Sequence, residues 1–421
     1  MASMSESADT TDGDTSAASQ HPAAIDWATD FDIGDARYES DPYEIWDELR
    51  TSCPIARTER RGGAWLPTTY DDVAAIAYDT DNFSSRRTNV LPEPPGSTLL
   101  VAPPITSDPP FHTKARRLLL EYFSPKRIAP LEAKTRSICA ELLDAIEAKG
   151  TPTADAAAEY AQHIPVRIIA HMLGIPEEDE AQFTDWAVRI FQDGIDDPDI
   201  VRDAIKEVLA YFDAQVADRR LEPKDDLLTD LLAKDLDGDP LTNKHLLGTC
   251  FLLLMAGIDT TWSGIGASLW HLATHRADRD RLVAEPELLP TAVEEFLRAY
   301  SPVTMAREVI HDVEVNGCPM HAGDRVLLNF PAGNRDPAKF DRADEVVIDR
   351  QKNRHFAFGI GIHRCLGSNV ARMEMSVAIE AWLSRFPHFE IDEDIDVRWG
   401  GAQVRGPRQV PVVLDGRAAT D

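Results

Sequence analysis

Residues 355–367, HFAFGIGIHRCLG, place one cysteine among three glycines. Gly359, Gly361 and Gly367 permit tight turns and let the backbone approach a flat ligand closely. Cys365 lies just before an expected helix, and the free amides at a helix N-terminus stabilise a thiolate and donate to its sulfur. This arrangement suits a permanent, electron-rich sulfur ligand. The alternative is a buried structural cysteine, the usual role of a free thiol. We adopt that alternative for the other four: Cys53, Cys139, Cys250 and Cys318.

Two pairs of ionisable residues have the spacing of one helical face. Glu295 and Arg298 lie three residues apart, and His112 and Arg116 lie four apart. Taken alone, the first pair is a surface ion pair, which adds little stability. The second is a pair of solvated side chains. Spacing alone leaves these interpretations open.

An acid and two hydroxyls follow the most apolar stretch of the chain, in the sequence LLLMAGIDTT. Asp259 and Thr260 are costly in a core unless they serve a purpose there. Gly257 weakens a helix by about 1 kcal/mol relative to alanine. One interpretation is a kink, with the Thr260 hydroxyl bonded to a carbonyl of the preceding turn. Such a bond is compatible with a functional role for the same residues.

The elements that carry these residues are mostly helices. Periodicity predicts a long helix over residues 243–275 and a last helix over 368–386. Short strands are expected between residues 308 and 328, with a turn at Asn316-Gly317. We therefore expect a mainly α fold with a small β-sheet region, the α+β class. The other expected helices are 42–50, 112–122, 130–148, 155–172, 179–192, 198–218, 225–234 and 285–300.

The chain is expected to form one domain over residues 25–421, because no repeat or flexible linker divides it. Residues 1–24 are expected to be a disordered acidic tail. Seven prolines between residues 88 and 110 predict a long irregular loop, and such loops are often functional.

Composition excludes several classes of protein. With 43 basic and 72 acidic residues the net charge is −29, which disfavours binding to the phosphates of nucleic acids. The N-terminal residues lack the apolar region of a secretory signal. The most apolar stretch, Cys250–Ile258, is well short of the ~20 residues that span a bilayer, so no membrane segment is expected. Five scattered cysteines indicate a reduced, cytoplasmic protein.

The cysteine segment resembles the haem-binding loop of the cytochrome P450 family. The pattern F-x-x-G-x-H-x-C-x-G is matched at Phe358, Gly361, His363, Cys365 and Gly367. The likeness extends over about residues 40–413 and is to soluble bacterial class I members, similar to the camphor-hydroxylating type. It implies haem b, with O2 as co-substrate and Cys365 as the proximal ligand, whose electron density promotes O–O cleavage. Phe358 would pack against the sulfur, and His363 would meet a haem propionate.

The resemblance also assigns the paired residues. Glu295 and Arg298 match the family's ExxR pair, completed by Arg350, which stabilises the cysteine loop. His112 and Arg116 match positions that neutralise the haem propionates. Further cofactor contacts are implied at Arg307, Ala256, Gly257 and Gly359.

The segment AGIDTT matches the family's A-G-x-D/E-T motif, which implies a monooxygenase that hydroxylates a C–H bond. Thr260 would hold water and dioxygen, and Asp259 would pass protons toward them. A peroxide-driven peroxygenase is the first alternative, but peroxide arrives protonated and does not need this pair. A non-catalytic haem-thiolate sensor is the second, and no output domain is visible.

Alignment with the family predicts an aliphatic pocket, and therefore a compact apolar substrate such as a terpenoid. Fatty acids, aromatics and macrolide or steroid skeletons stay open. Helices over residues 181–211 are expected to form a lid with a joint at 193–198. Arg405 is a weaker candidate for a polar substrate group. The predicted pocket residues are Val101, Ile105, Leu252, Met255, Val303, Thr304 and Val404.

The resemblance implies an external electron donor, because the sequence shows no flavin or ferredoxin segment. Seven basic residues against three acidic ones lie in 108–136, and five against none in 350–373. A basic patch on an acidic chain steers an acidic partner. We expect a ferredoxin with an NAD(P)H-dependent reductase, a flavodoxin being the alternative, and a monomeric enzyme.

Overall fold

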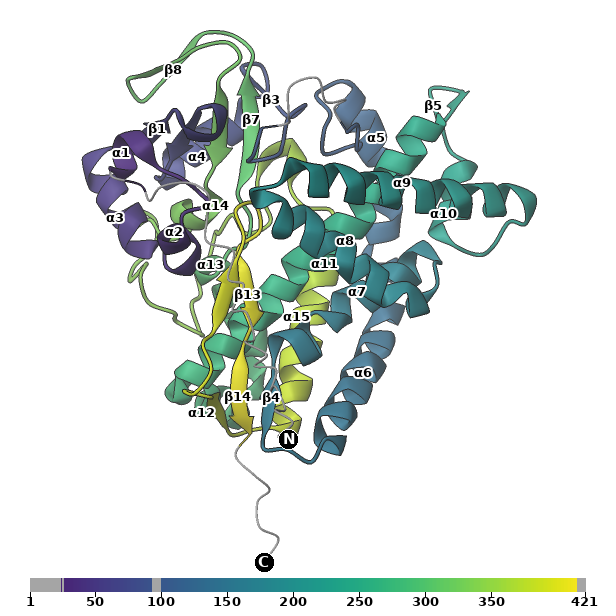
Figure 1. The fold of residues 1–421 in the computed structure, drawn as a ribbon, viewed down its shortest axis with the longest axis vertical. Helices are drawn as coiled ribbons and strands as arrows, with labels where there is room; N and C mark the ends of the chain where they lie inside the picture. Colours follow the sequence, from purple (N-terminus) through teal and green to yellow (C-terminus); the bar gives the residue numbers. More distant parts are fainter. Residues whose placement is uncertain (1–23, 25, 93–99, 415–421) are drawn as a thin grey trace, which may run out of the picture.

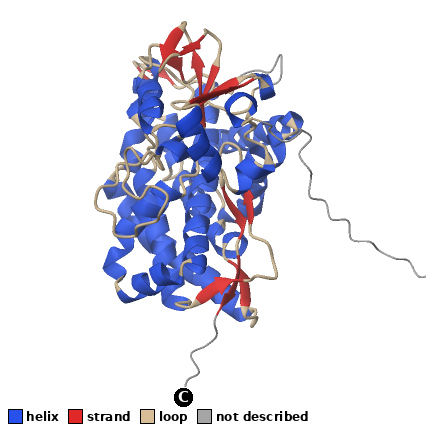
Figure 2. Ribbon diagram, turned by 90° about the vertical axis from the view of Figure 1, so that its left-hand side faces the viewer, coloured by secondary structure: helices blue, strands red, loops and turns tan. Residues whose placement is uncertain are grey.

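The computed structural model describes residue 24, residues 26–92 and residues 100–414. A mainly helical body carries its largest sheet at one edge (Figures 1 and 2), which confirms the predicted α+β class. The predicted tail, apart from Ala24, lies outside the described residues. So do residues 93–99 of the predicted loop. The described parts of that loop, 88–92 and 100–110, contain no helix or strand.

Several helices begin at side chains that satisfy their free amides. Thr69 accepts from Asp72, Asp226 from Thr229, and Thr242 from His245. The longer helices are α3 Tyr43–Ser52, α4 Tyr70–Tyr78, α5 Phe111–Leu119, α6 Pro125–Ala148, α7 His163–Leu173, α8 Glu180–Phe191, α9 Pro198–Leu221, α11 Asn243–Thr274, α12 Arg276–Ala284, α13 Leu289–Ala299 and α15 Ser368–Arg385. The shorter ones are α1 Trp27–Asp30, α2 Ala36–Ser40, α10 Leu227–Leu232 and α14 Phe330–Gly333.

Helix α11 runs through the middle of the molecule and contacts α7, α9, α13 and α15 (Figure 1). It is apolar on nearly all sides, as expected of a helix surrounded by others. Among the described residues it is the one helix long and apolar enough to cross a membrane, with a mean hydropathy of 1.4. Because 72% of its most apolar window is buried inside the protein, it is a core helix.

Five strands form the main sheet, in the order β1-β2-β10-β7-β3. The predicted hairpin at Asn316-Gly317 is confirmed, with φ of 47° and 81° at these two residues. The main-sheet strands are β1 Ile55–Thr58, β2 Ala64–Pro67, β3 Phe83–Ser84, β7 Met305–Val309 and β10 Arg325–Leu328. A second sheet holds β4 Thr153–Asp155, β11 Phe389–Ile391 and β14 Pro411–Leu414. The two-stranded pairs are β5 Asp235–Leu236 with β6 Asp239–Pro240, β8 Val313–Val315 with β9 Cys318–Met320, and β12 Arg398–Gly400 with β13 Gly406–Gln409.

Several predicted boundaries were wrong. Helix α6 begins at Pro125 instead of residue 130, because Pro125 rather than Pro130 takes the first turn after Ser124. The helix expected over 155–172 is divided by a π turn, Ala157–Ala161, before α7. Helix α12 and the C-terminal strands were not predicted. These elements are short, and α12, β11 and β13 pack against α11; such long-range contacts leave no periodic pattern in the sequence.

Candidate haem-thiolate site

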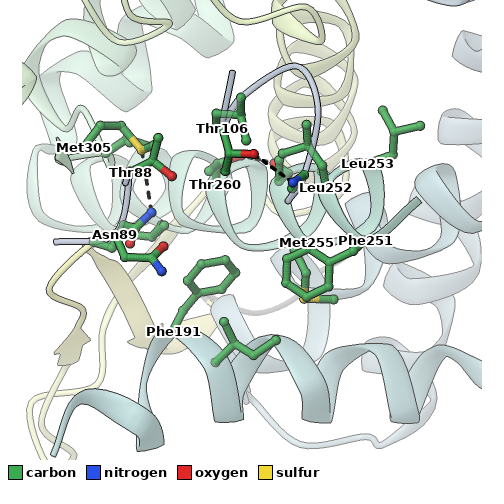
Figure 3. Close-up of a pocket in the computed structure, with 18 of the residues that line it drawn as sticks. Thr88, Asn89, Thr106, Phe191, Phe251, Leu252, Leu253, Met255, Thr260 and Met305 are labelled. Carbon is green, nitrogen blue, oxygen red and sulfur yellow. Dashed lines mark hydrogen bonds between the residues drawn. The ribbon is translucent and has the colours of Figure 1, made fainter. Parts of the chain in front are cut away.

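A cavity of about 1230 Å³ lies against α11 and the cysteine loop. Figure 3 shows part of its lining, with Leu252, Met255 and Thr260 on α11 and Phe191 at the end of α8. Predicted residues from distant parts of the sequence meet on this one surface. They are Val101, Ile105, Arg116, Leu252, Met255, Ala256, Gly257, Thr260, Val303, Arg307, Phe358, Gly359, His363, Cys365, Gly367 and Val404.

Backbone hydrogen bonds within the cysteine loop, residues 355–367, fix its conformation. The Cys365 N–H donates to the Phe358 carbonyl at 2.8 Å, and the Gly359 N–H donates to Phe356 at 2.7 Å. Gly359 and Gly361 have φ of 62° and 68°, which favours glycine at both positions. A Cβ on Gly361 would also lie 3.1 Å from the carbonyl oxygen of Ala77. The loop therefore presents the sulfur in one fixed place.

Cys365 differs from the other cysteines in its surroundings. Its side chain faces the cavity, although dense protein surrounds it on the other sides. Burial raises the pKa of its thiol, while the Gly367 N–H and the Arg116 guanidinium favour the thiolate and oppose that shift. Burial alone raises the pKa of Cys250 to about 12, since little there favours the charged form. A metal ion bound to the Cys365 sulfur would stabilise the thiolate further.

Beside the cysteine, buried nitrogen donors lack protein acceptors. Both ring nitrogens of His112 and Nε2 of His363 have no hydrogen-bond partner among the described residues, and the two rings lie 4.3 Å apart. Arg307 is 6% exposed and donates only to the Ala306 carbonyl; burial lowers its pKa to about 10. Buried donors without acceptors are costly. Carboxylates of a ligand would satisfy them, so these residues fit the propionates of haem.

Glu295, Arg298 and Arg350 form a buried cluster, so the surface ion-pair interpretation is wrong. Glu295 and Arg298 are 0% exposed and joined by bonds of 2.8 and 2.9 Å. Arg350 donates to Glu295 at 2.9 Å. Arg298 also donates to three carbonyls, those of Asn334, Ala343 and Glu345. The cluster ties α13 to the segment that precedes the cysteine loop.

Helix α11 separates its two polar residues. The Thr260 hydroxyl lines the cavity and donates to the Ala256 carbonyl at 2.9 Å, which is the back-bond considered above. Asp259 is 0% exposed, does not line the cavity, and pairs instead with Arg408 of β13. Burial raises the pKa of Asp259, and the Arg408 cation opposes that shift. Arg408 was not predicted, since nothing in its sequence neighbourhood points to α11.

Two pocket expectations need correction. Thr304 does not line the cavity, because its backbone is tied to the Gln403 carbonyl at 3.0 Å and the side chain is buried. Arg405 turns away from the cavity and donates to the Glu39 carbonyl at 2.7 Å. His112 does not line the cavity either; its ring packs against the ring of His363, which does. Lining residues that were not predicted individually include Leu100, Ile190, Phe191, Leu209, Leu247, Phe251, Met305 and Gln403.

A cysteine that faces the cavity, buried nitrogen donors beside it and a long apolar wall are the features of a haem-thiolate site. The family model for cytochrome P450 matches residues 189–398. The chain is 35% identical to the mycinamicin IV hydroxylase/epoxidase of Micromonospora griseorubida, over 87% of this chain and 94% of that protein. It is 34% identical to the polyketide biosynthesis cytochrome P450 PksS of Bacillus subtilis (strain 168), over 90% and 96%. The crystal structure of CYP109E1 from Bacillus megaterium with testosterone is 30% identical, with a TM-score of 0.83 over 89% of this chain and 98% of that one.

The chain therefore belongs to the cytochrome P450 family. It is a P450 monooxygenase that uses haem b and O2. The fold and the cysteine loop agree with this assignment.

Proposed function

We propose that this monooxygenase hydroxylates an apolar small molecule with electrons from a separate ferredoxin. The observation that carries the proposal is the shared cavity, in which aliphatic side chains of α11 and α9 face the same space as Cys365. Apolar walls of this kind bind apolar ligands and exclude water. We propose a cytoplasmic monomer, in keeping with the reduced cysteines and the buried position of α11.

The substrate class follows from the cavity. Its volume of about 1230 Å³ holds the cofactor as well as the substrate, which favours a compact skeleton such as a terpenoid. The relatives argue for testing larger skeletons too, since two of them are named for mycinamicin and polyketide biosynthesis. A binding screen of terpenoids, steroids and macrolides, read by the change in iron spin state, decides between these sizes.

The roles of the site residues are part of the proposal. Haem b, when bound, supplies the iron centre at which O2 is activated. Cys365 would ligate the iron, and Phe358 would pack beside the sulfur. His112, Arg116, Arg307 and His363 bind the propionates. Ala256, Gly257, Gly359 and Gly367 provide close backbone approach.

When haem is bound, Thr260 would position water and O2 with its hydroxyl, and Asp259 would carry protons toward them. Val101, Ile105, Leu252, Met255, Val303 and Val404 orient the substrate. Glu295, Arg298 and Arg350 keep the cysteine loop in place and take no part in the chemistry.

The electron donor is proposed from surface charge. Some basic residues of the predicted patch form ion pairs within the protein: Lys134 pairs with Glu177, and Arg372 pairs with Glu294. Six exposed ones hold no ion pair among the described residues: Arg117, Lys126, Arg127, Lys352, Arg354 and Arg364. Arg364 precedes the haem ligand directly. These charges complement an acidic ferredoxin.

The deciding experiment is turnover of the purified haem protein. With a ferredoxin, its reductase and NAD(P)H, we expect O2 consumption and a hydroxylated product from a substrate found by the spin-state screen. Turnover with hydrogen peroxide alone would favour a peroxygenase instead. Spectral binding without any product under either condition would contradict catalysis and favour a sensor.

A further inference from the structure

The short strand β13 packs against helix α11 (Figure 1) and carries one cation that reaches this helix. The cation is Arg408, whose side chain is 10% exposed. Its guanidinium contacts both carboxylate oxygens of Asp259 and lies 3.3 Å from the Ser263 hydroxyl. It also stacks over the Trp262 ring at 4.9 Å. Such a fork-to-carboxylate geometry is specific to arginine.

Two glycines allow β13 and Arg408 to pack this closely. A Cβ on Gly406 would lie 2.3 Å from the Ser263 side chain, so that only glycine lets β13 touch α11 here. A Cβ on Gly400 would lie 3.1 Å from Cγ of Arg408. Because both positions are closely packed, the guanidinium has little freedom to choose other partners.

One nitrogen of Arg408 joins two regions of the site. Its Nη2 donates to Asp259 Oδ2 at 3.1 Å and to the Val404 carbonyl at 3.0 Å. Val404 lines the cavity and is bridged to Val303, another lining residue. Asp259, by contrast, is fully buried and turned away from the cavity that Thr260 faces. Nη2 therefore links the Val404 carbonyl to a carboxylate that Nη1 also holds.

We propose that Arg408 is a positioning residue that makes proton delivery by Asp259 depend on what occupies the cavity at Val404. This rests on the proposed function. Hydroxylation consumes R–H, O2, two electrons and two protons and yields R–OH and water; the electrons come from the ferredoxin. While Arg408 holds Asp259, the carboxyl stays away from the oxygen site. Contact of substrate with Val404 shifts the shared Nη2 bond and frees Asp259 to pass solvent protons toward Thr260.

The first test is a double-mutant cycle on the haem protein, read by infrared spectroscopy of the Asp259 carboxyl band, assigned with Asp259→Asn. Val404→Phe fills the cavity at this point without added substrate. We expect Val404→Phe to shift the band when Arg408 is present and to leave it unchanged in Arg408→Lys, which keeps the charge but loses the second bond. An additive cycle overturns the proposal.

The second test mixes the dithionite-reduced protein with O2 and follows the rate of re-oxidation and its solvent isotope effect. Arg408→Gln frees Asp259, so we expect re-oxidation about tenfold faster than in the wild type, with a changed isotope effect. Arg398→Gln, which removes an exposed charge from the same strand pair, should behave as the wild type. An unchanged rate in Arg408→Gln overturns the proposal. If that variant does not take up haem, Arg408→Lys decides in its place.

Both tests run without substrate, so they are independent of the proposed function. Failure of the wild type to form any hydroxylated product would overturn the proposed function and leave the link between Val404, Arg408 and Asp259 to be judged by the cycle.

Discussion

At the scale of single residues, the site gathers buried polar groups that have few partners in the described part of the chain. There, both ring nitrogens of His112 and Nε2 of His363 have no hydrogen-bond partner, Arg307 donates to one carbonyl, and Cys365 directs its sulfur into the cavity. Buried donors without acceptors cost free energy, and the carboxylates of a ligand would compensate these. The haem assignment therefore has a physical basis in this chain apart from its relatives.

Replacing Cys365 with alanine should remove the thiolate ligand. We expect the red-shifted absorption band of the reduced carbon monoxide complex to disappear. The matched control is Cys250→Ala, a fully buried thiol on α11 that should leave the band in place. Survival of the band in Cys365→Ala would refute the ligand assignment.

Replacing Thr260 with alanine should uncouple O2 consumption from product formation, by about tenfold or more, because a hydroxyl at the oxygen site is lost. Thr274 on the same helix makes the same back-bond, from its hydroxyl to the Trp270 carbonyl at 2.9 Å, but it is exposed to solvent. Thr274→Ala therefore controls for loss of the back-bond alone. Equal coupling in both variants would remove Thr260 from the mechanism.

Glu374 on α15 predicts a pH effect on stability. It is 2% exposed, it has no hydrogen-bond partner among the described residues, and burial raises its pKa to about 8. The folded protein therefore keeps it protonated at pH values where the unfolded chain ionises it, so its contribution to stability is full below about pH 4.5 and falls until about pH 8. Glu374→Gln should remove this fall.

Thermal unfolding at several pH values measures the difference between Glu374→Gln and the wild type. We expect the variant to gain on the order of 3 kcal/mol relative to the wild type between about pH 5 and pH 9. A difference that stays constant with pH would mean that Glu374 is solvated or paired.

At the scale of elements, buried charges join the ExxR helix α13 to the segment that leads to the cysteine loop, in addition to the apolar packing between them. Glu295 accepts from Arg298, Arg350, Asn353 and the Val347 backbone. Each partner comes from a segment without regular structure, apart from Arg298. A single carboxylate thus organises the irregular stretch that leads to Cys365.

Glu295→Gln should destabilise the fold by about 3–5 kcal/mol, because two buried guanidinium groups lose their counter-charge. Glu132→Gln removes an exposed partner of Arg136 and should cost at most about 1 kcal/mol. Denaturant unfolding followed at the haem absorbance measures both. Equal stability of the two variants would contradict the structural role of Glu295.

At the scale of the whole molecule, the net charge of −29 contrasts with unpaired basic residues around Cys365. Reversing Lys126 to glutamate should slow reduction by ferredoxin several-fold at low salt, and the difference should shrink as salt rises. Lys149→Glu, after the other end of α6, is the control. Stopped-flow reduction measures the rates, and identical salt dependence in both variants would place the docking surface elsewhere.

The sequence was sufficient for the class of fold and for most of the residues that line the cavity, those of the cysteine loop included. These depend on local spacing: glycines at turns, residues three or four apart on a helix, and a long motif around Cys365. The local sequence located α11 and α15 to within a few residues, because the residues that favour and end a helix lie within it or next to it.

Tertiary structure alone decided which side chains meet across the fold. Arg408 lies 149 residues from Asp259, and its partner is set by how β13 packs on α11. Thr304 and Arg405 were misplaced for the same reason, since the direction of a side chain in an irregular segment depends on long-range contacts. The loop sequence proposed Cys365 as the ligand, and the tertiary structure added the cavity that it faces and the arginines beside it.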